Sequence, residues 1–190
     1  MPDHFAALDQ PRRPWLDAAA LKDSFHRLSA TLHPDVPGSG DSARFVALNA
    51  AYTVLCDPAA RARHLLELEA PSLPAAAAAP PPALGDLFMR QAAIHQRLAA
   101  LVAKRSAAGN PLARALLASE EVALRHEAET AQAALEAEHA SALEELRALD
   151  ARWPAAAETG FAQLAELQRR LAFLGKWRMQ LIEALFRLGE

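Results

Sequence analysis

Apolar residues recur at helical spacing in two neighbouring segments near the N-terminus. The first stripe has spacings of four, three and four positions and consists of Leu21, Phe25, Leu28 and Leu32. The second stripe follows a short polar connection and consists of Phe45, Leu48, Tyr52 and Leu55. Such spacing is typical of amphipathic α-helices, and two of them joined by a short connection pack antiparallel. The pattern therefore predicts a helical hairpin.

Shorter segments with helix signals flank this hairpin. Residues 3–9 are expected to form a short helix with Phe5 and Leu8 facing inward. Asp17 is a plausible N-cap for the helix that ends at Leu32. After the hairpin, Asp57 precedes a proline at the first helical position, a good start signal for a fourth helix.

The C-terminal half is helical in pattern almost to its end. A first helix is expected from Leu84 to about residue 108, where a Gly-Asn-Pro sequence supplies end and start signals. A second helix runs to about Arg152, where Trp153-Pro154 ends it. A third carries a near-heptad leucine seam from Leu164 to Leu188. Three helices with short breaks predict an antiparallel three-helix bundle and an all-α fold.

Residues 70–83 form the clearest boundary. This segment contains five successive alanines followed by three prolines, and consecutive prolines favour an extended, semi-rigid spacer. We therefore predict a first domain over residues 1–69, a linker over residues 70–83 and the bundle over residues 84–190. The alternative is a loop that lies along a single domain, because proline-rich segments also pack.

Composition narrows the classes of function. The net charge of −3 argues against nucleic acid as the main partner, and no run of about 18 apolar residues could span a bilayer. The N-terminus lacks the basic and apolar regions of a signal peptide, and a single cysteine excludes an internal disulfide. These features predict a cytoplasmic protein.

No chemical motif predicts catalysis or a bound cofactor. The seven histidines and one cysteine lack the close spacing of a preformed metal site. Cys56 has no evident basic neighbour in the sequence, and we expect it to be a small hydrophobic residue of its helix. Glycine-rich phosphate loops are absent. The sequence therefore predicts neither an enzyme, nor a metal site, nor a cofactor.

Charge is distributed unevenly over the bundle. Residues 119–150 contain nine acidic side chains against Arg125 and Arg147, whereas residues 169–187 are mainly basic. Opposite signs on neighbouring helices would favour their association, at about 0–1 kcal/mol for each exposed pair. Two independently solvated faces are the alternative.

The connection between the hairpin helices carries the tripeptide His33-Pro34-Asp35. Together with the following Leu48-Asn49-Ala50-Ala51-Tyr52, Leu55-Cys56-Asp57-Pro58 and Arg61, it resembles the J-domain, the module that stimulates ATPase chaperones of the DnaK class. The resemblance implies that His33, Pro34 and Asp35 dock on the chaperone and promote hydrolysis of its ATP. Asp35 would offer a carboxylate for a charge-assisted bond to an arginine.

Basic residues on the helix before this tripeptide usually help J-domains to dock. In this chain, Lys22 and Arg27 are the candidates, and Val36-Pro37 stands where a lysine is common in the family. The resemblance therefore implies the docking mode, with a thinner basic face than is usual.

Three further segments, two of them in the C-terminal half, suggest which J-proteins are most similar. Arg61-Ala62-Arg63-His64-Leu65-Leu66, Leu87-Phe88-Met89-Arg90-Gln91 and Leu171-Ala172-Phe173-Leu174-Gly175-Lys176-Trp177 resemble segments of the HscB family, co-chaperones in iron–sulphur cluster assembly. In that family an IscU-type scaffold protein binds an apolar patch on the bundle. The matching positions are Phe88, Met89, Ala92 and Phe173. The alternative is that they are core residues, because apolar residues at helical spacing usually pack inward.

The resemblance implies a co-chaperone that delivers an iron–sulphur scaffold to an HscA- or DnaK-type ATPase. One alternative is a J-protein whose bundle binds another client. A second alternative, of a different class, is a helical adaptor with weakened chaperone coupling, as the thin basic face allows.

Overall fold

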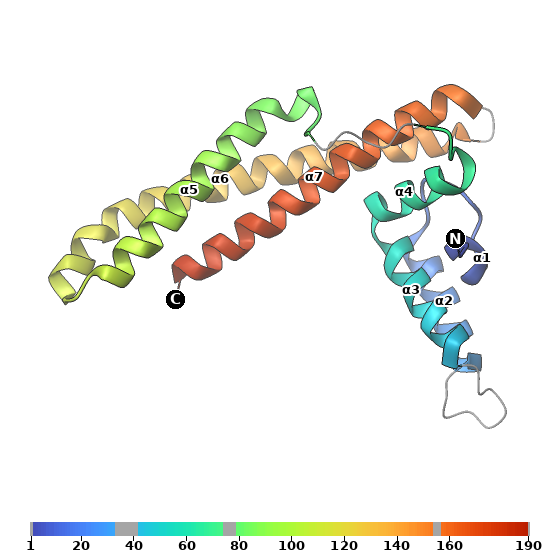
Figure 1. The fold of residues 1–190 in the computed structure, drawn as a ribbon, viewed down its shortest axis with the longest axis horizontal. Coiled ribbons are helices and arrows are strands. Elements are labelled where there is room, and N and C mark those ends of the chain that lie inside the picture. The colour runs from blue at the N-terminus through green and yellow to red at the C-terminus, as the bar shows by residue number, and fades with distance from the viewer. Residues whose placement is uncertain (1, 33–41, 74–78, 154–156, 190) are drawn as a thin grey trace. The chain divides into compact units, whose positions relative to one another are not determined.

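The computed structural model describes residues 2–32, 42–73, 79–153 and 157–189. All regular elements in these ranges are helices, as predicted (Figure 1). The N-terminal part contains α1 (His4–Ala7), α2 (Ala18–Leu32), α3 (Ser42–Cys56) and α4 (Pro58–Glu69). A 3₁₀ turn, η1 (Pro82–Leu84), precedes α5 (Gly85–Ala107), α6 (Pro111–Asp150) and α7 (Ala157–Gly189).

The chain divides into two compact units. The first contains Met1–Ala76 together with Leu143–Arg169, and the second contains Ala77–Ala142 together with Arg170–Glu190. This division differs from the three segments expected from the sequence, because the end of α6 and the start of α7 group with the N-terminal helices. Much of the expected linker, residues 74–78, lies outside the described residues, and the domain boundaries stay a prediction.

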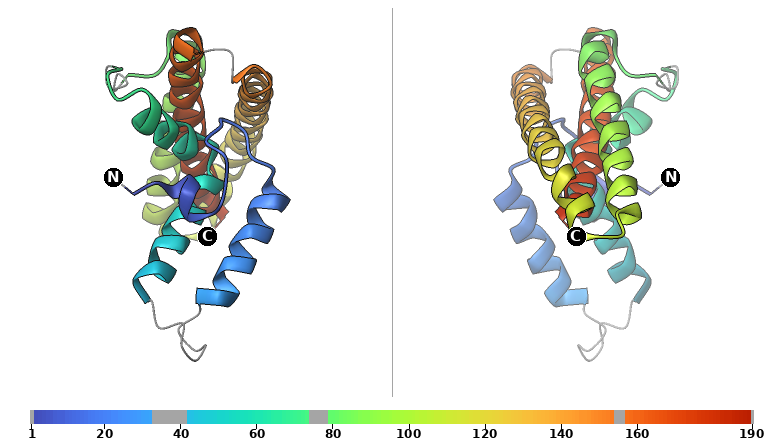
Figure 2. Two further views of the ribbon diagram at one scale, coloured as in Figure 1. Left: turned by 90° about the vertical axis from the view of Figure 1, so that its right-hand side faces the viewer. Right: turned by 90° about the vertical axis from the view of Figure 1, so that its left-hand side faces the viewer.

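In the first unit, α1, α2 and α4 all pack against α3 (Figure 2). The fully buried side chains include Phe5, Leu8, Leu21, Leu48, Leu55 and Leu65. The rings of Phe25 and Tyr52 stack between α2 and α3, with centroids 4.2 Å apart. Burial of these apolar side chains stabilises the hairpin that the two apolar stripes predict.

The predicted helix starts are confirmed by their capping hydrogen bonds. The backbone N–H groups of Ala20 and Ala60 donate to the carboxylates of Asp17 and Asp57, each at 2.8 Å. At the start of α6, Asn110 accepts a hydrogen bond from the backbone N–H of Ala113 at 2.8 Å. A cap satisfies a donor that has no partner within its helix, which explains why such short sequence signals locate helix starts.

A buried histidine joins α1 to α4. His64 is 4% exposed, and its Nε2 accepts a hydrogen bond from the backbone N–H of His4 at 3.1 Å. Its ring stacks on the ring of Phe5, and the two ring centroids are 5.7 Å apart. Burial lowers the pKa of His64, which favours the neutral imidazole that this hydrogen bond requires.

A polar network ties the segment before α2 to the end of α6. The carboxylate of Asp150, which is 7% exposed, accepts hydrogen bonds from Arg13 and from the backbone N–H of Trp15 at 3.1 Å. The guanidinium of Arg147 lies over the Trp15 ring, 4.2 Å from its centroid. These contacts explain why the end of α6 belongs to the first unit.

Arg61 is the buried cation of the same unit. It is 3% exposed and donates to the carbonyl oxygens of Pro14 and Leu55. Burial lowers the pKa of Arg61, and the negative charges of Asp57 and Asp150 act in the opposite direction. Asp150 therefore partners Arg13 directly and also compensates a buried positive charge.

Neutralising this carboxylate is expected to destabilise the protein. Asp150→Asn should lower the free energy of unfolding by about 2–3 kcal/mol, because it weakens charge-assisted bonds to Arg13 and to a backbone N–H. The side chain of Arg13 is 44% exposed, so water recovers part of the loss. The matched control is Asp9→Asn, which breaks an exposed pair with Arg27. Asp9 has a φ of 52°, which asparagine tolerates.

Urea denaturation measures both variants. We expect Asp9→Asn to stay within about 0.5 kcal/mol of wild type. Equal stabilities of the two variants would contradict a structural role for Asp150.

In the second unit, α5, α6 and α7 run side by side as the predicted antiparallel bundle (Figure 1). Its core draws on η1 and all three helices and contains Leu84, Ile94, Leu98, Leu101, Leu124, Ala128, Ala131, Leu135, Leu174, Trp177, Leu181 and Ala184. Partly buried Leu87 and Phe173 pack against this cluster.

Among the described ion pairs that join α6 to another helix of the bundle, most are formed with α5. The charge pattern of the sequence favours pairing with α7. The pairs between α5 and α6 are Arg97–Glu127, Lys104–Glu120 and Arg105–Glu121, at 2.5, 2.9 and 3.5 Å. The pair between Arg170 of α7 and Glu138 is longer, at 3.7 Å. The charges of residues 119–150 and 169–187 alone favour α7, but α5 also presents basic side chains to α6.

Two further expectations can be compared with the fold. Cys56 is exposed at the end of α3, so the expectation that it packs as a small hydrophobic residue of its helix is wrong. Among the helices of the described ranges, none is long and apolar enough to cross a membrane.

Candidate functional site

The predicted chaperone-docking site centres on the connection between α2 and α3. His33, Pro34 and Asp35 lie outside the described residues, between the last residue of α2 and the first residue of α3. In the sequence the tripeptide thus falls between the two helices of the predicted hairpin. Its role in docking on the chaperone stays a prediction.

The two basic candidates of this site, Lys22 and Arg27, are both exposed on α2. They are five positions apart, which places them about 140° from one another around the helix axis. Arg27 also forms an ion pair with Asp9 at 3.1 Å, with both side chains well exposed. The helix thus holds the two cations on different sides of its apolar stripe and does not bring them together.

The predicted client-binding residues lie at the start of α5 and in the middle of α7. Phe88 and Met89 are exposed, with 39% and 67% of their surfaces accessible. Ala92 and Phe173 are half-buried. Phe88 and Met89 are therefore surface residues, whereas Phe173 also packs against the core of the bundle.

Trp177 joins these residues, although the sequence interpretation did not include it in the site. It is 4% exposed, and its ring lies 5.6 Å from the ring of Phe88 and 5.6 Å from the ring of Phe173. Aromatic pairs at such distances attract one another beyond their simple burial. One signal was present in the sequence: Trp177 follows Phe173 by four positions and thus shares its helix face. We call Phe88, Met89, Ala92, Phe173 and Trp177 the aromatic patch.

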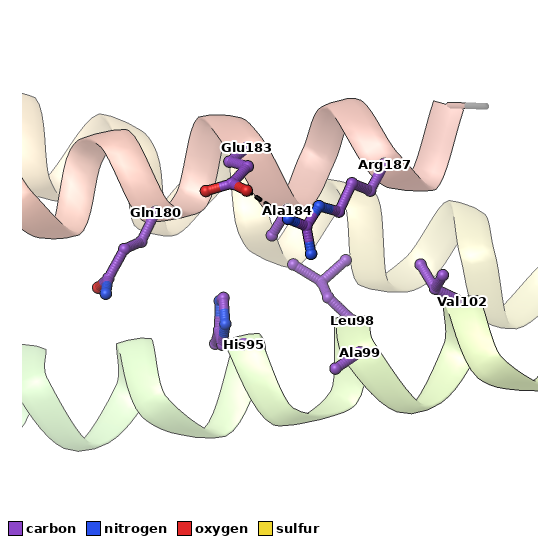
Figure 3. Close-up of a pocket in the computed structure, with 8 residues that line it drawn as sticks. All are labelled: His95, Leu98, Ala99, Val102, Gln180, Glu183, Ala184 and Arg187. Carbon is purple, nitrogen blue, oxygen red and sulfur yellow. Dashed lines mark hydrogen bonds and ion pairs between the residues drawn. The ribbon is translucent and has the colours of Figure 1, made fainter.

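A groove between α5 and α7 continues from this patch. Its first pocket, of about 230 Å³, is lined by Phe88, Gln91, Ala92, His95, Gln96, Trp177 and Gln180. The next pocket, of about 350 Å³, shares His95 and Gln180 with the first (Figure 3). In Figure 3, Gln180 extends from α7 towards α5, and Glu183 pairs with Arg187 at the far end.

These pockets do not have the composition of a metal centre. In the described ranges, no cluster of three or more His, Cys, Asp or Glu side chains could hold a metal ion. The geometry near the patch instead combines exposed apolar side chains with neutral amides. Such a surface suits a protein partner, because exposed aromatic groups backed by a rigid core supply the anchors of interfaces.

Comparison with known proteins agrees with the N-terminal part of this picture. The DnaJ domain family matches residues 3–64, a range that includes the tripeptide and both candidate cations. Curated relatives from Paraburkholderia phymatum, Paraburkholderia phytofirmans and Paraburkholderia xenovorans, each described as a co-chaperone protein HscB homolog, are 38% identical over 72 residues. Each alignment covers 34% of this chain and 41% of the relative.

Solved structures extend the likeness to the whole fold. Human co-chaperone protein HscB has a TM-score of 0.61 and 16% identity, and the match covers 96% of this chain and 82% of the human chain. Chaperone HscB from Vibrio cholerae has a TM-score of 0.54 and 21% identity, and the match covers 98% and 99% of the two chains. At such identities the likeness concerns the fold alone. Residues 3–64 therefore match the DnaJ domain family, and the chain shares its fold with the HscB co-chaperones.

Proposed function

We propose that this protein is a cytoplasmic co-chaperone. It stimulates ATP hydrolysis by an HscA- or DnaK-type chaperone and delivers an IscU-type iron–sulphur scaffold protein to it. The observation that carries the proposal is the DnaJ-domain match over residues 3–64, which contains His33-Pro34-Asp35. In this function the chain activates the chaperone's chemistry and is not itself an enzyme.

The two halves of the proposal use different surfaces. Docking on the chaperone uses the tripeptide, with Asp35 bound to a chaperone arginine and Lys22 and Arg27 in contact with acidic side chains. Both basic side chains are exposed, which supports their availability to a partner. Because they lie on different sides of α2, they are expected to act separately and not as one basic cluster.

Client binding uses the aromatic patch. Phe88 and Met89 are free to contact a partner, and Trp177 and Phe173 support them from the bundle core. Exposed apolar side chains on a packed base lose little conformational entropy on binding, which supports an interface with a folded scaffold protein.

The test of the proposal is the ATPase of the chaperone under single-turnover conditions. We expect the purified protein to accelerate hydrolysis, to accelerate it further when an iron–sulphur scaffold is added, and to co-elute with that scaffold in gel filtration. Stimulation of the ATPase without co-elution of the scaffold would indicate a J-protein with another client. Co-elution without stimulation would indicate an adaptor that no longer acts on a chaperone.

A further inference from the structure

Gln91 is a buried side chain with an unused hydrogen-bond acceptor. It is 5% exposed, and its Nε2 donates a long hydrogen bond, 3.4 Å, to the backbone carbonyl of Trp177. Its Oε1 is closed to solvent and has no hydrogen-bond partner among the described residues. Buried polar groups are nearly always hydrogen-bonded, so an acceptor without a partner at this position needs a physical explanation.

No donor of the described residues forms a hydrogen bond with Gln91 Oε1, although Gln91 lines two hollows of the second unit. One is a void of about 10 Å³ that Gln91 lines together with Leu87, Arg90, Ala131, Ala134 and Leu135. This volume is at the lower limit of what a single water molecule needs, and most of the lining is apolar. The other is the larger, 230 Å³ pocket of the aromatic patch. The pocket is thus the direction from which a partner group can reach the amide.

The lining of that pocket restricts what enters it. Phe88, Ala92 and Trp177 contribute apolar surface, while Gln96, Gln180 and His95 contribute polar groups with no carboxylate, lysine or arginine among them. A charged group would lose its hydration there without gaining an opposite charge. An uncharged apolar side chain accompanied by a hydrogen-bond donor fits both the walls and the unused acceptor.

We propose that Gln91 Oε1 accepts a hydrogen bond from a backbone N–H or a hydroxyl of the bound iron–sulphur scaffold, whose uncharged segment enters the pocket beside Phe88. This inference rests on the proposed function and extends it, because it assigns the polar contact that orients the client on an otherwise apolar patch. The scaffold is the occupant because the pocket shares Phe88 and Ala92 with the proposed client-binding residues. Since Oε1 is closed in the free chain, the contact forms when the Gln91 side chain turns towards the pocket.

This arrangement predicts effects of opposite sign on stability and on binding. Gln91→Met keeps an unbranched side chain of similar length and removes the unpartnered acceptor. The melting temperature of the free protein is expected to rise by about 2–4 °C, because a buried polar group without a partner destabilises the folded state. Affinity for the scaffold should fall about tenfold, because the donor of the scaffold is then buried without an acceptor.

The matched control is Gln163→Met. Gln163 lies on α7, does not line the pocket and is exposed, so its amide is hydrated in the free protein. We expect this variant to keep the melting temperature of wild type and to bind the scaffold within about twofold of it. Thermal melts and calorimetric titrations with a purified IscU-type scaffold measure both variants.

The outcomes separate the inference from the function on which it rests. A Gln91→Met variant that binds as tightly as wild type overturns the inference and leaves the function standing. A fall in both melting temperature and affinity also overturns it, because a purely structural role then explains both changes. If wild type does not bind the scaffold at all, the proposed function fails and the proposed occupant fails with it.

Discussion

His33→Gln and Asp35→Asn are each expected to abolish stimulation of the chaperone ATPase while the protein stays folded. In the sequence, both residues come after Leu32, the last residue of α2, and before Ser42, the first residue of α3. The contacts that hold the two helices together, such as the stacking of Phe25 on Tyr52, remain in place. The melting temperature should therefore change by no more than about 2 °C. The loss of ATPase stimulation, in contrast, should be complete, because the proposed docking depends on the imidazole and the carboxylate themselves.

Single-turnover ATP hydrolysis by the chaperone, with increasing concentrations of each variant, measures this effect. Scaffold binding provides the internal control, since both variants keep the aromatic patch and should bind the scaffold as wild type does. Stimulation that survives either substitution would show that this chain does not act through the J-domain mechanism. A variant that also loses scaffold binding would show that the substitution had damaged more than the docking site.

Local signals explain why so much of the fold was predictable. Asp17, Asp57 and Asn110 bind backbone groups three positions further along the chain, so the cap and the helix start are read from the same few residues. The apolar stripes likewise identify the buried faces of α2, α3 and the bundle helices, because helical periodicity and burial are directly linked.

Contacts between distant segments were not predictable in this way. Arg13 and Asp150 are 137 positions apart, and nothing in either local sequence indicates the partner. The same holds for the ion pairs of α6, whose acidic residues pair with cations in the second half of α5. A count of charges per segment cannot show which faces meet, since that depends on how the helices are rotated within the bundle.

The client-binding residues could be predicted from the sequence only in part. Phe88 follows a core-facing leucine directly, so its helical position marks it as a flank of the apolar stripe, where burial depends on the neighbouring helix. The structure decides this point for Phe88 and Met89, which are exposed, and for Phe173, which is half-buried. Gln91 lies on this stripe, four positions after Leu87 and three before Ile94, so its burial follows from the spacing. Its unused Oε1, in contrast, is visible only in the structure.

Replacing the two exposed residues of the aromatic patch should remove most of the affinity for the scaffold. The double variant Phe88→Ala/Met89→Ala is expected to weaken binding by about 2–4 kcal/mol, or roughly 30- to 1000-fold, since a few apolar anchors carry most of the energy of an interface. Phe173 is left unchanged because it packs against the bundle core, and its truncation would mix a loss of binding with a loss of stability. The double variant itself should unfold within a few degrees of wild type, because both side chains are substantially exposed.

The second unit provides a control matched in residue type, with both side chains exposed. Phe186→Ala/Met179→Ala removes the same two kinds of side chain from α7, where they are 68% and 66% exposed. Calorimetric titration with the scaffold should show nearly unchanged binding for this control, and both double variants should still stimulate the chaperone ATPase through the intact tripeptide. Equal losses of affinity in the two variants would mean that any exposed apolar side chain on the bundle contributes to binding. A loss confined to the Phe186 variant would move the client site away from the aromatic patch and onto the outer face of α7.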